Sequence, residues 1–123
     1  MSITKLVIIG LLFLFTIGTG IWLSNSGRPL NNILFNIHKL IALISVIYTV
    51  VIIRNIIKNM DVKSLIIVLI IFSALFIIAL FVTGALLSPG KPANDLLLII
   101  HNISMVLLVI SIIAMFYFIS NNT

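Results

Sequence analysis

Four long apolar stretches, separated by three short polar segments, make up almost the whole chain. They cover residues 6–23, 33–53, 65–87 and 96–119, and each is close to the ~20 residues that an α-helix needs to cross the hydrocarbon core of a bilayer. The segments between them are rich in Ser, Asn, Gly, Pro and Lys, which is typical of loops. The pattern therefore predicts four transmembrane helices.

The many Ile and Val residues in these stretches do not indicate β-strands. In lipid, every backbone polar group must be paired within a helix or within a closed barrel. A barrel strand alternates apolar and polar residues, whereas these stretches are continuously apolar. The fold class predicted from the pattern is therefore all-α.

Composition supports the membrane interpretation. Of the 123 residues, 63% are hydrophobic and only 7% are charged, and the mean hydropathy is +1.43. A small water-soluble domain exposes too much of its surface to hide so many apolar side chains, so we expect one transmembrane domain over residues 1–123. The sequence contains no cysteine, which excludes disulfides, thiolate zinc sites, iron–sulfur clusters and haem attached through a C-x-x-C-H motif.

The net charge of +5 comes from seven basic residues and two Asp. The basic residues lie in or beside the polar segments without forming a nucleic-acid patch, so we expect lipid headgroups and not nucleic acid as their partners. The side that holds both termini has the larger basic set: Lys5, Arg54, Lys58 and Lys63 against Arg28, Lys39 and Lys91. The positive-inside rule then predicts a multi-pass protein of the cell membrane with both termini in the cytoplasm.

Two parts of the sequence are copies of each other. Residues 27–38 read GRPLNNILFNIH and residues 90–101 read GKPANDLLLIIH, with six of the twelve positions identical. Upstream, the pattern T-G-x-x-L-S starts at Thr19 and again at Thr83. An apolar bias alone does not reproduce Gly, Pro, Asn and His in the same order. We therefore define repeat 1 as residues 1–59 and repeat 2 as residues 64–119.

Each repeat holds two spans, so both repeats enter the membrane in the same direction, related by a two-fold axis along the membrane normal. The predicted fold is an all-α integral membrane four-helix bundle made of two tandem helix-loop-helix repeats. A cleaved signal peptide ending near Ser24–Ser26 is the alternative for the first stretch. The copy of its end in the third stretch argues against that alternative.

His38 and His101 hold equivalent places in the two repeats. Each lies six residues after the polar start of its helix, at Asn32 or Asp95, which is ~9 Å along the helix axis. Because both helices start on the same membrane face, the two histidines are predicted at one depth in the outer leaflet. Two imidazoles on opposite faces of the macrocycle give a six-coordinate haem iron. We therefore expect one haem b per chain, with His38 and His101 as the axial ligands of the iron.

Other uses of the histidine pair stay open. An ionisable residue inside a membrane is costly and by default indicates a function, but a membrane histidine also commonly hydrogen-bonds a neighbouring helix. One alternative is therefore a structural pair in an anchor subunit of a membrane complex. Another is a paired-histidine site in a small membrane transporter, although the two carboxylates, Asp61 and Asp95, lie at loop edges outside the spans.

Three further pairs of equivalent residues flank the predicted haem site: Gly20 and Gly84, Thr19 and Thr83, and Arg28 and Lys91. The glycines either let a porphyrin edge approach the backbone or serve close helix packing. The threonines hydrogen-bond either an imidazole N–H or the backbone of their own helix. The two basic residues bind either haem propionates or lipid headgroups. The sequence leaves each of these alternatives open.

On His38 and His101 with their flanking glycines, the chain resembles the membrane b-type cytochromes, helical bundles that hold haem between histidines of two helices. In the larger members, each ligand helix carries a further histidine for a second haem. The corresponding positions here hold other residues: Val51 and Ile52 in one helix, Ala114 and Met115 in the other. The resemblance therefore implies a single haem.

The resemblance also implies electron transfer near the extracytoplasmic face, with quinol or a redox protein as partner. It favours an electron carrier or haem-binding protein over a stand-alone enzyme, since no nucleophile, base and acid set is visible in the sequence. Haem sensing, haem storage and self-association into a homodimer stay open.

Overall fold

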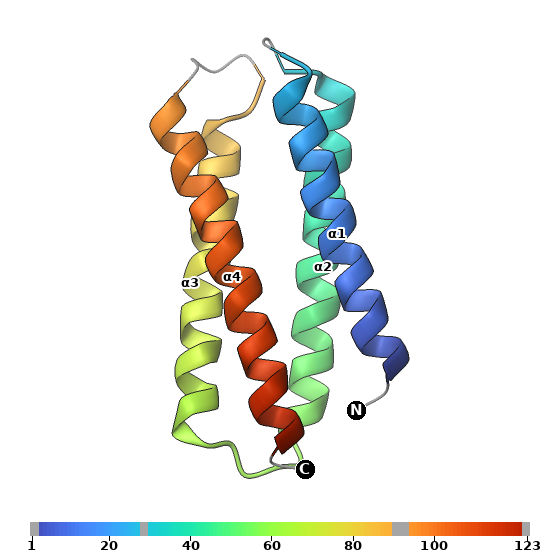
Figure 1. Cartoon of the computed structure of the whole chain (residues 1–123), viewed down its shortest axis with the longest axis vertical. Coiled ribbons are helices and arrows are strands. Elements are labelled where there is room, and N and C mark those ends of the chain that lie inside the picture. The colour runs from blue at the N-terminus through green and yellow to red at the C-terminus, as the bar shows by residue number, and fades with distance from the viewer. Residues whose placement is uncertain (1–2, 28–29, 90–93, 122–123) are drawn as a thin grey trace. The chain divides into compact units, whose positions relative to one another are not determined.

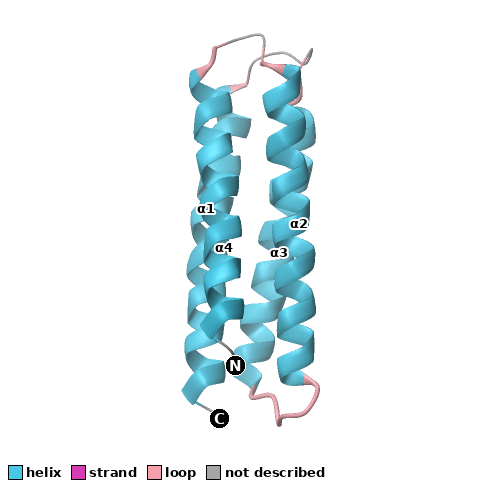
Figure 2. Ribbon diagram, turned by 90° about the vertical axis from the view of Figure 1, so that its right-hand side faces the viewer, coloured by secondary structure: helices cyan, strands magenta, loops and turns pink. Residues whose placement is uncertain are grey.

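The computed structural model describes residues 3–27, 30–89 and 94–121. Within these ranges the chain forms four α-helices and no strand: α1 over Ile3–Asn25, α2 over Asn32–Ile57, α3 over Ser64–Leu86 and α4 over Asp95–Asn121. Figure 2 shows that the described residues outside the helices form only short connections. The predicted all-α fold class is confirmed.

The helix ends differ slightly from the ends of the apolar stretches. α2 continues to Ile57, past the predicted end at residue 53, because Arg54 and Asn55 interrupt the apolar run but not the helical hydrogen bonding. The backbone N–H of Lys58 still donates to the carbonyl of Arg54 at 3.1 Å. α3 instead ends at Leu86, one residue short of the prediction.

The chain divides into two compact units, Met1–Met60 and Asp61–Thr123. In the first unit α1 packs against α2, and we call this pair hairpin 1; in the second α3 packs against α4, and we call this pair hairpin 2. The two helices of each hairpin run antiparallel (Figure 1). The division between the units falls in the polar segment that separates the two sequence repeats.

Equivalent asparagines begin the second helix of each hairpin. The side-chain oxygen of Asn31 accepts hydrogen bonds from the backbone N–H groups of Ile33 and Leu34, at 2.9 and 3.1 Å. The side-chain oxygen of Asn94 accepts from the N–H of Leu97 at 3.1 Å. The first N–H groups of a helix have no partner within the helix, so both asparagines act as N-caps. The predicted helix starts at Asn32 and Asp95 follow directly from these caps.

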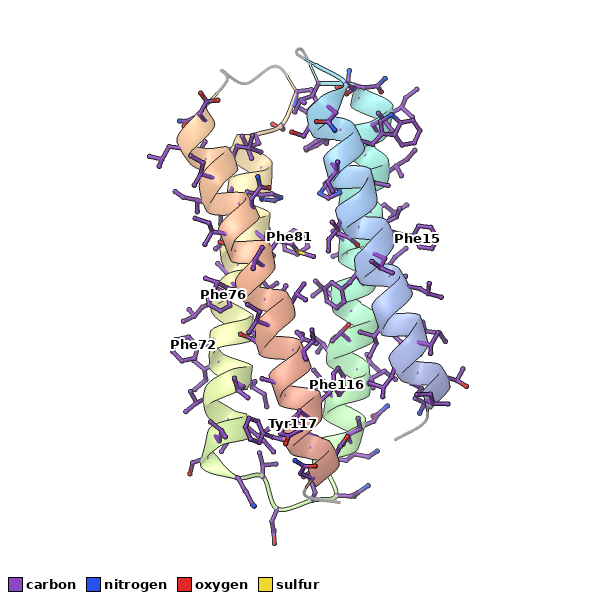
Figure 3. All side chains as sticks on the ribbon, viewed as in Figure 1. Phe15, Phe72, Phe76, Phe81, Phe116 and Tyr117 are labelled. Carbon is purple, nitrogen blue, oxygen red and sulfur yellow. The ribbon has the colours of Figure 1, made fainter. Side chains whose placement is uncertain are left out.

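Most apolar side chains point out of the hairpins. In each described helix, no more than 22% of the most apolar 18-residue window is buried. Figure 3 shows Phe15 projecting away from α2 and Phe72 projecting away from α4. All four described helices are long and apolar enough to cross a membrane, and lipid covers such side chains at no hydrophobic cost. The chain is therefore a multi-pass membrane protein whose helices contact the bilayer.

Both hairpins bury apolar and hydroxyl side chains, but mostly at different positions of the repeat. Hairpin 1 buries several large apolar side chains: Ile9, Leu23, Leu34, Ile52 and Ile53. Between them it also buries the hydroxyl side chains of Thr16, Ser45 and Thr49. In hairpin 2 the most deeply buried side chains are apolar: Ile66, Leu108, Met115 and Ile119. Hairpin 2 also buries the hydroxyl side chains of Ser73, Thr83, Ser104 and Ser111. The two repeats thus have the same arrangement of helices but differ in the side chains that they bury.

Candidate functional site

The His38 ring lies against the C-terminal part of α1, half-buried between the two helices of hairpin 1. Its Nδ1 is 3.1 Å from the hydroxyl oxygen of Thr19. The same hydroxyl is 2.8 Å from the carbonyl of Phe15 and 3.0 Å from the carbonyl of Thr16, and donates to them.

Hairpin 2 repeats this arrangement with equivalent residues. Nδ1 of His101 is 2.8 Å from the hydroxyl oxygen of Thr83. That hydroxyl donates to the carbonyls of Ala79 and Leu80, at 2.7 and 3.2 Å. Of the two uses that the sequence left open for Thr19 and Thr83, both are therefore realised at once: each threonine bonds its own helix backbone and an imidazole.

The threonine contacts favour one tautomer of each histidine, with the proton on Nδ1. A hydroxyl has one hydrogen, and in each threonine the helix backbone takes it, so the hydroxyl oxygen is left to accept. In the favoured tautomer Nδ1 of each ring is the donor, and the neutral ring carries its lone pair on Nε2. A histidine that binds a metal through one nitrogen usually donates its other N–H in this way, which orients the ring and raises its basicity.

Gly20 and Gly84 lie beside the histidine rings. A Cβ at Gly20 would stand 2.9 Å from Cε1 of His38, 3.4 Å from Nδ1 and 3.6 Å from Nε2. A Cβ at Gly84 would meet only Cε1 of His101 within 4 Å, at 3.5 Å. Gly20 thus makes room for the His38 imidazole, whereas a Cβ at Gly84 would make only an ordinary contact with the His101 imidazole. This arrangement of the two glycines is closer to the helix-packing alternative than to the alternative in which a porphyrin edge approaches the backbone.

One contact of hairpin 1 escaped the sequence interpretation. The hydroxyl oxygens of Thr16 and Ser45 lie 3.0 Å apart, both buried, and join α1 to α2. Ser45 lies seven residues, or about two turns, after His38 on α2. The signal that would have found this contact is the pair of hydroxyl residues in otherwise apolar stretches. The sequence alone indicates no hydrogen-bond partner for either residue.

Arg28 and Lys91, the predicted propionate-binding pair, lie outside the described residues, as do Pro29, Gly90 and Pro92 of the repeat pattern. Their assignment stays a prediction from sequence. Six residues of the candidate site therefore lie within the described part of the structure: Thr19, Gly20, His38, Thr83, Gly84 and His101.

The donor set of these residues fits a haem better than a bare metal ion. Among the residues that the structure describes, no group of three or more His, Cys, Asp or Glu lies close enough together to hold a metal ion. A haem supplies four ring nitrogens itself and needs only two axial ligands from the protein. Each hairpin offers one imidazole of the kind that serves as such a ligand, held through Nδ1 against a threonine.

Comparison of the chain with protein-family models, with curated proteins and with solved structures finds no match. The function proposed below is therefore argued from the chemistry of the two hairpins.

Proposed function

We propose that the chain is a membrane cytochrome that binds one haem b, with Nε2 of His38 and Nε2 of His101 as the two axial ligands of the iron. The observation that supports this most directly is the same Thr–His contact in both hairpins. In the tautomer that this contact favours, the threonine oxygen accepts Nδ1–H and the lone pair on Nε2 is the coordinating one.

If the second histidine were only a remnant of the duplication, nothing would require it to keep its contact with a threonine. The copies have diverged at many positions, yet Thr, Gly and His remain in both, with the imidazole against the glycine and the hydroxyl in each case. Because each repeat crosses the membrane twice, α2 and α4 start on the same membrane face. The two imidazoles then have one depth available for a shared haem, in the leaflet away from the termini.

Bound haem supplies one-electron exchange between its ferrous and ferric states. The residues of this chain hold and orient it: the histidines coordinate, the threonines fix the ring orientation, and the glycines bring the imidazoles close to α1 and α3. With a histidine at each axial position, the iron would have no open coordination position for oxygen. The proposed function is therefore electron transfer with a quinol or a redox protein, not oxygen activation.

The test is the visible spectrum of the protein purified in detergent after expression with added haem precursor. We expect a low-spin b-type spectrum after dithionite reduction, with one haem per chain. His38→Ala and His101→Ala should each abolish the low-spin spectrum. Asn102→Ala, which changes an exposed polar residue beside His101, is the control and should leave it unchanged. A protein that stays colourless with added hemin refutes the proposal.

One observation favours a second candidate, a structural subunit. The Thr–His bonds join α1 to α2 and α3 to α4, and such hydrogen bonds alone stabilise helix pairs in membranes by about 0.6 kcal/mol on average. A structural subunit would show no chromophore and would copurify with a partner protein. In that case His38→Asn, which keeps a hydrogen-bond donor but not an iron ligand of this kind, would preserve function.

A further inference from the structure

The side of α2 that faces away from α1 is polar near the start of the helix. Asn32, Asn36 and Lys39 follow one another at spacings of four and three residues, so they lie on one face, and all three are exposed. We call them the polar face of α2. Ser45, which contacts α1, follows Asn36 by nine residues. At ~100° per residue, Ser45 and Asn36 lie on opposite sides of the helix. The polar face is therefore outside the α1–α2 contact of hairpin 1.

This polar face extends into the apolar span. Lys39 lies seven residues after Asn32, the first residue of α2, which is ~10 Å along the helix axis. Nζ of Lys39 is 5.6 Å from the ring centroid of Phe35, a residue one turn nearer the helix start. The ammonium is thus turned back towards the membrane surface, as expected of a lysine that keeps its charge out of the hydrocarbon. Asn36 lies within one turn of Lys39, and its amide group can donate two hydrogen bonds.

Hairpin 1 has no acidic residue that could pair with Lys39. The two acidic residues of the chain, Asp61 and Asp95, both belong to the second compact unit. A cation or an amide at the edge of the hydrocarbon is costly unless it has a polar partner. The polar face of α2 is therefore suited to an anionic acceptor that comes from outside hairpin 1.

Deeper in the membrane, the same side of α2 is apolar. The exposed side chains that follow Asn36 by seven, eleven and fourteen residues return close to its side of the helix, and we call them the apolar track: Leu43, Ile47 and Val50. One side of α2 therefore has groups that can bind an anion near the membrane surface, and an apolar surface that continues towards the bilayer centre. An anionic phospholipid has its groups in the same order, with a phosphate at the surface and acyl chains below it.

Hairpin 2 does not repeat this set of groups. By the repeat alignment, its equivalent positions hold a carboxylate, an apolar side chain and an uncharged amide: Asp95, Ile99 and Asn102. A carboxylate repels a phosphate, and no cation is present at these positions to offset it. The polar face is thus a property of hairpin 1 and not of the repeat.

A second copy of the chain fits the polar face less well than a lipid does. In a two-fold symmetric contact, each surface meets the same surface of its partner. Such a contact through the polar face would bring two Lys39 side chains together, and like charges at an interface are unfavourable. The charge of Lys39 therefore favours an anionic occupant.

We infer that the polar face of α2 is a binding site for one anionic phospholipid, in the leaflet away from the N-terminus. The Lys39 ammonium contacts the lipid phosphate, the Asn36 amide donates a hydrogen bond to a phosphate or ester oxygen, and the acyl chains lie along the apolar track. This site goes beyond the proposed function and needs no haem, so either can fail without the other.

The test is native mass spectrometry of the protein in detergent, titrated with phosphatidylglycerol and with phosphatidylcholine of the same acyl chains. We expect one phosphatidylglycerol to bind more tightly than phosphatidylcholine does. Lys39→Gln should weaken that binding about fivefold, the size expected for one basic residue near an anionic lipid. Asn36→Leu should weaken it about threefold, the size expected for one hydrogen bond in a membrane. Lys39→Arg keeps the charge and should keep the affinity.

Lys63→Gln is the matched control, because it removes one exposed basic residue outside hairpin 1 and should leave the affinity unchanged. Equal binding of the two lipids, or an equal loss in Lys63→Gln and Lys39→Gln, overturns the inference. Glycerol phosphate, which has the phosphate without acyl chains, should not bind detectably; binding as tight as that of the lipid would mean a site for a soluble phosphate. A homodimer that Asn36→Leu dissociates would also overturn the inference, since a second copy would then cover the polar face.

Discussion

Hairpin 1 and hairpin 2 place the same two residue types, Thr and Gly, around an imidazole but stabilise the rest of the helix pair differently. Hairpin 1 buries Thr16, Ser45 and Thr49 along its length, where hairpin 2 has Leu80, Leu108 and Ile112. Hairpin 2 in turn buries Ser104 and Ser111, where hairpin 1 has Ile41 and Tyr48. The Thr–Gly–His contact is thus common to both hairpins, whereas the layers next to it differ.

The two hairpins also differ in how much space remains at the histidine. In water a hairpin gains stability by burying apolar area, but lipid is as apolar as leucine. Helix pairs in membranes therefore depend on close approach and hydrogen bonds. Hairpin 1 uses both near His38, through Gly20 and through Thr16 with Ser45. Its geometry should be the more sensitive of the two to substitution.

The largest expected difference is between Gly20→Ala and Gly84→Ala. The new methyl at Gly20 would stand 2.9 Å from Cε1 of His38, so the ring or the helix must move, at a cost of about 1–3 kcal/mol. The methyl at Gly84 would stand 3.5 Å from His101, an ordinary contact, and should change stability by less than about 0.5 kcal/mol. Unfolding in detergent measures both.

Gly18→Ala is the matched control for these two variants, because a Cβ at Gly18 meets nothing within 4 Å and the residue is exposed. It should behave like Gly84→Ala. If Gly20→Ala is as stable as Gly18→Ala and keeps the His38 ring in place, the close packing of hairpin 1 at this point is not significant.

A second comparison concerns buried hydroxyls without a partner. Among the described residues, the Thr49 hydroxyl of hairpin 1 and the Ser73 hydroxyl of hairpin 2 are buried and make no hydrogen bond. An unsatisfied buried hydroxyl is destabilising, so Thr49→Val and Ser73→Ala should each raise the unfolding free energy, by about 1 kcal/mol. Ser45→Ala removes a hydroxyl that has partners, at 2.7 and 3.0 Å, and should do the opposite. Destabilisation by Thr49→Val would mean that its hydroxyl has a role in the folded protein.

The N-caps offer a third comparison. Asn31 accepts hydrogen bonds from two backbone N–H groups and Asn94 accepts one. Asn31→Ala should therefore lower the unfolding free energy more than Asn94→Ala does, by about 1 kcal/mol for Asn31→Ala. Asn31→Asp and Asn94→Asp keep the acceptor oxygen and should restore stability. Helix content and thermal unfolding in detergent measure the effect. Equal losses in both hairpins would show that the second bond of Asn31 adds nothing.

The smallest expected effect on stability comes from Thr19→Val and Thr83→Val. Each removes one hydrogen bond to an imidazole, worth about 0.6 kcal/mol in membrane proteins. The more informative measurement is the nitrogen-15 spectrum of the histidine rings, where we expect the Nδ1–H tautomer to give way to a mixture. Thr19→Ser and Thr83→Ser retain the hydroxyl and should retain the tautomer. An unchanged tautomer in the valine variants would contradict our assignment of Nδ1–H to the threonines.

The sequence by itself determined the parts that depend on local pattern. Apolar stretches of membrane length predict helices because lipid offers the backbone no other partners, and all four appear among the described residues. The polar residues Asn32 and Asp95 predict where α2 and α4 begin, since the signals that start a helix act on residues only two or three positions away. The copied residues also identified every side chain of the candidate site that the structure describes, from Thr19 to His101.

Only the tertiary structure decided which contacts those residues make. Sequence left Gly20 and Thr19 with two uses each, because a small residue or a hydroxyl fits several neighbours until the facing helix is in place. The structure puts the imidazole there, and Thr19 serves both the backbone and the ring. The pairing of Thr16 with Ser45, 29 residues apart in sequence, was likewise beyond prediction. Its physical reason is the register of α1 against α2, which apolar stretches of similar residues specify weakly and side-chain packing specifies strongly.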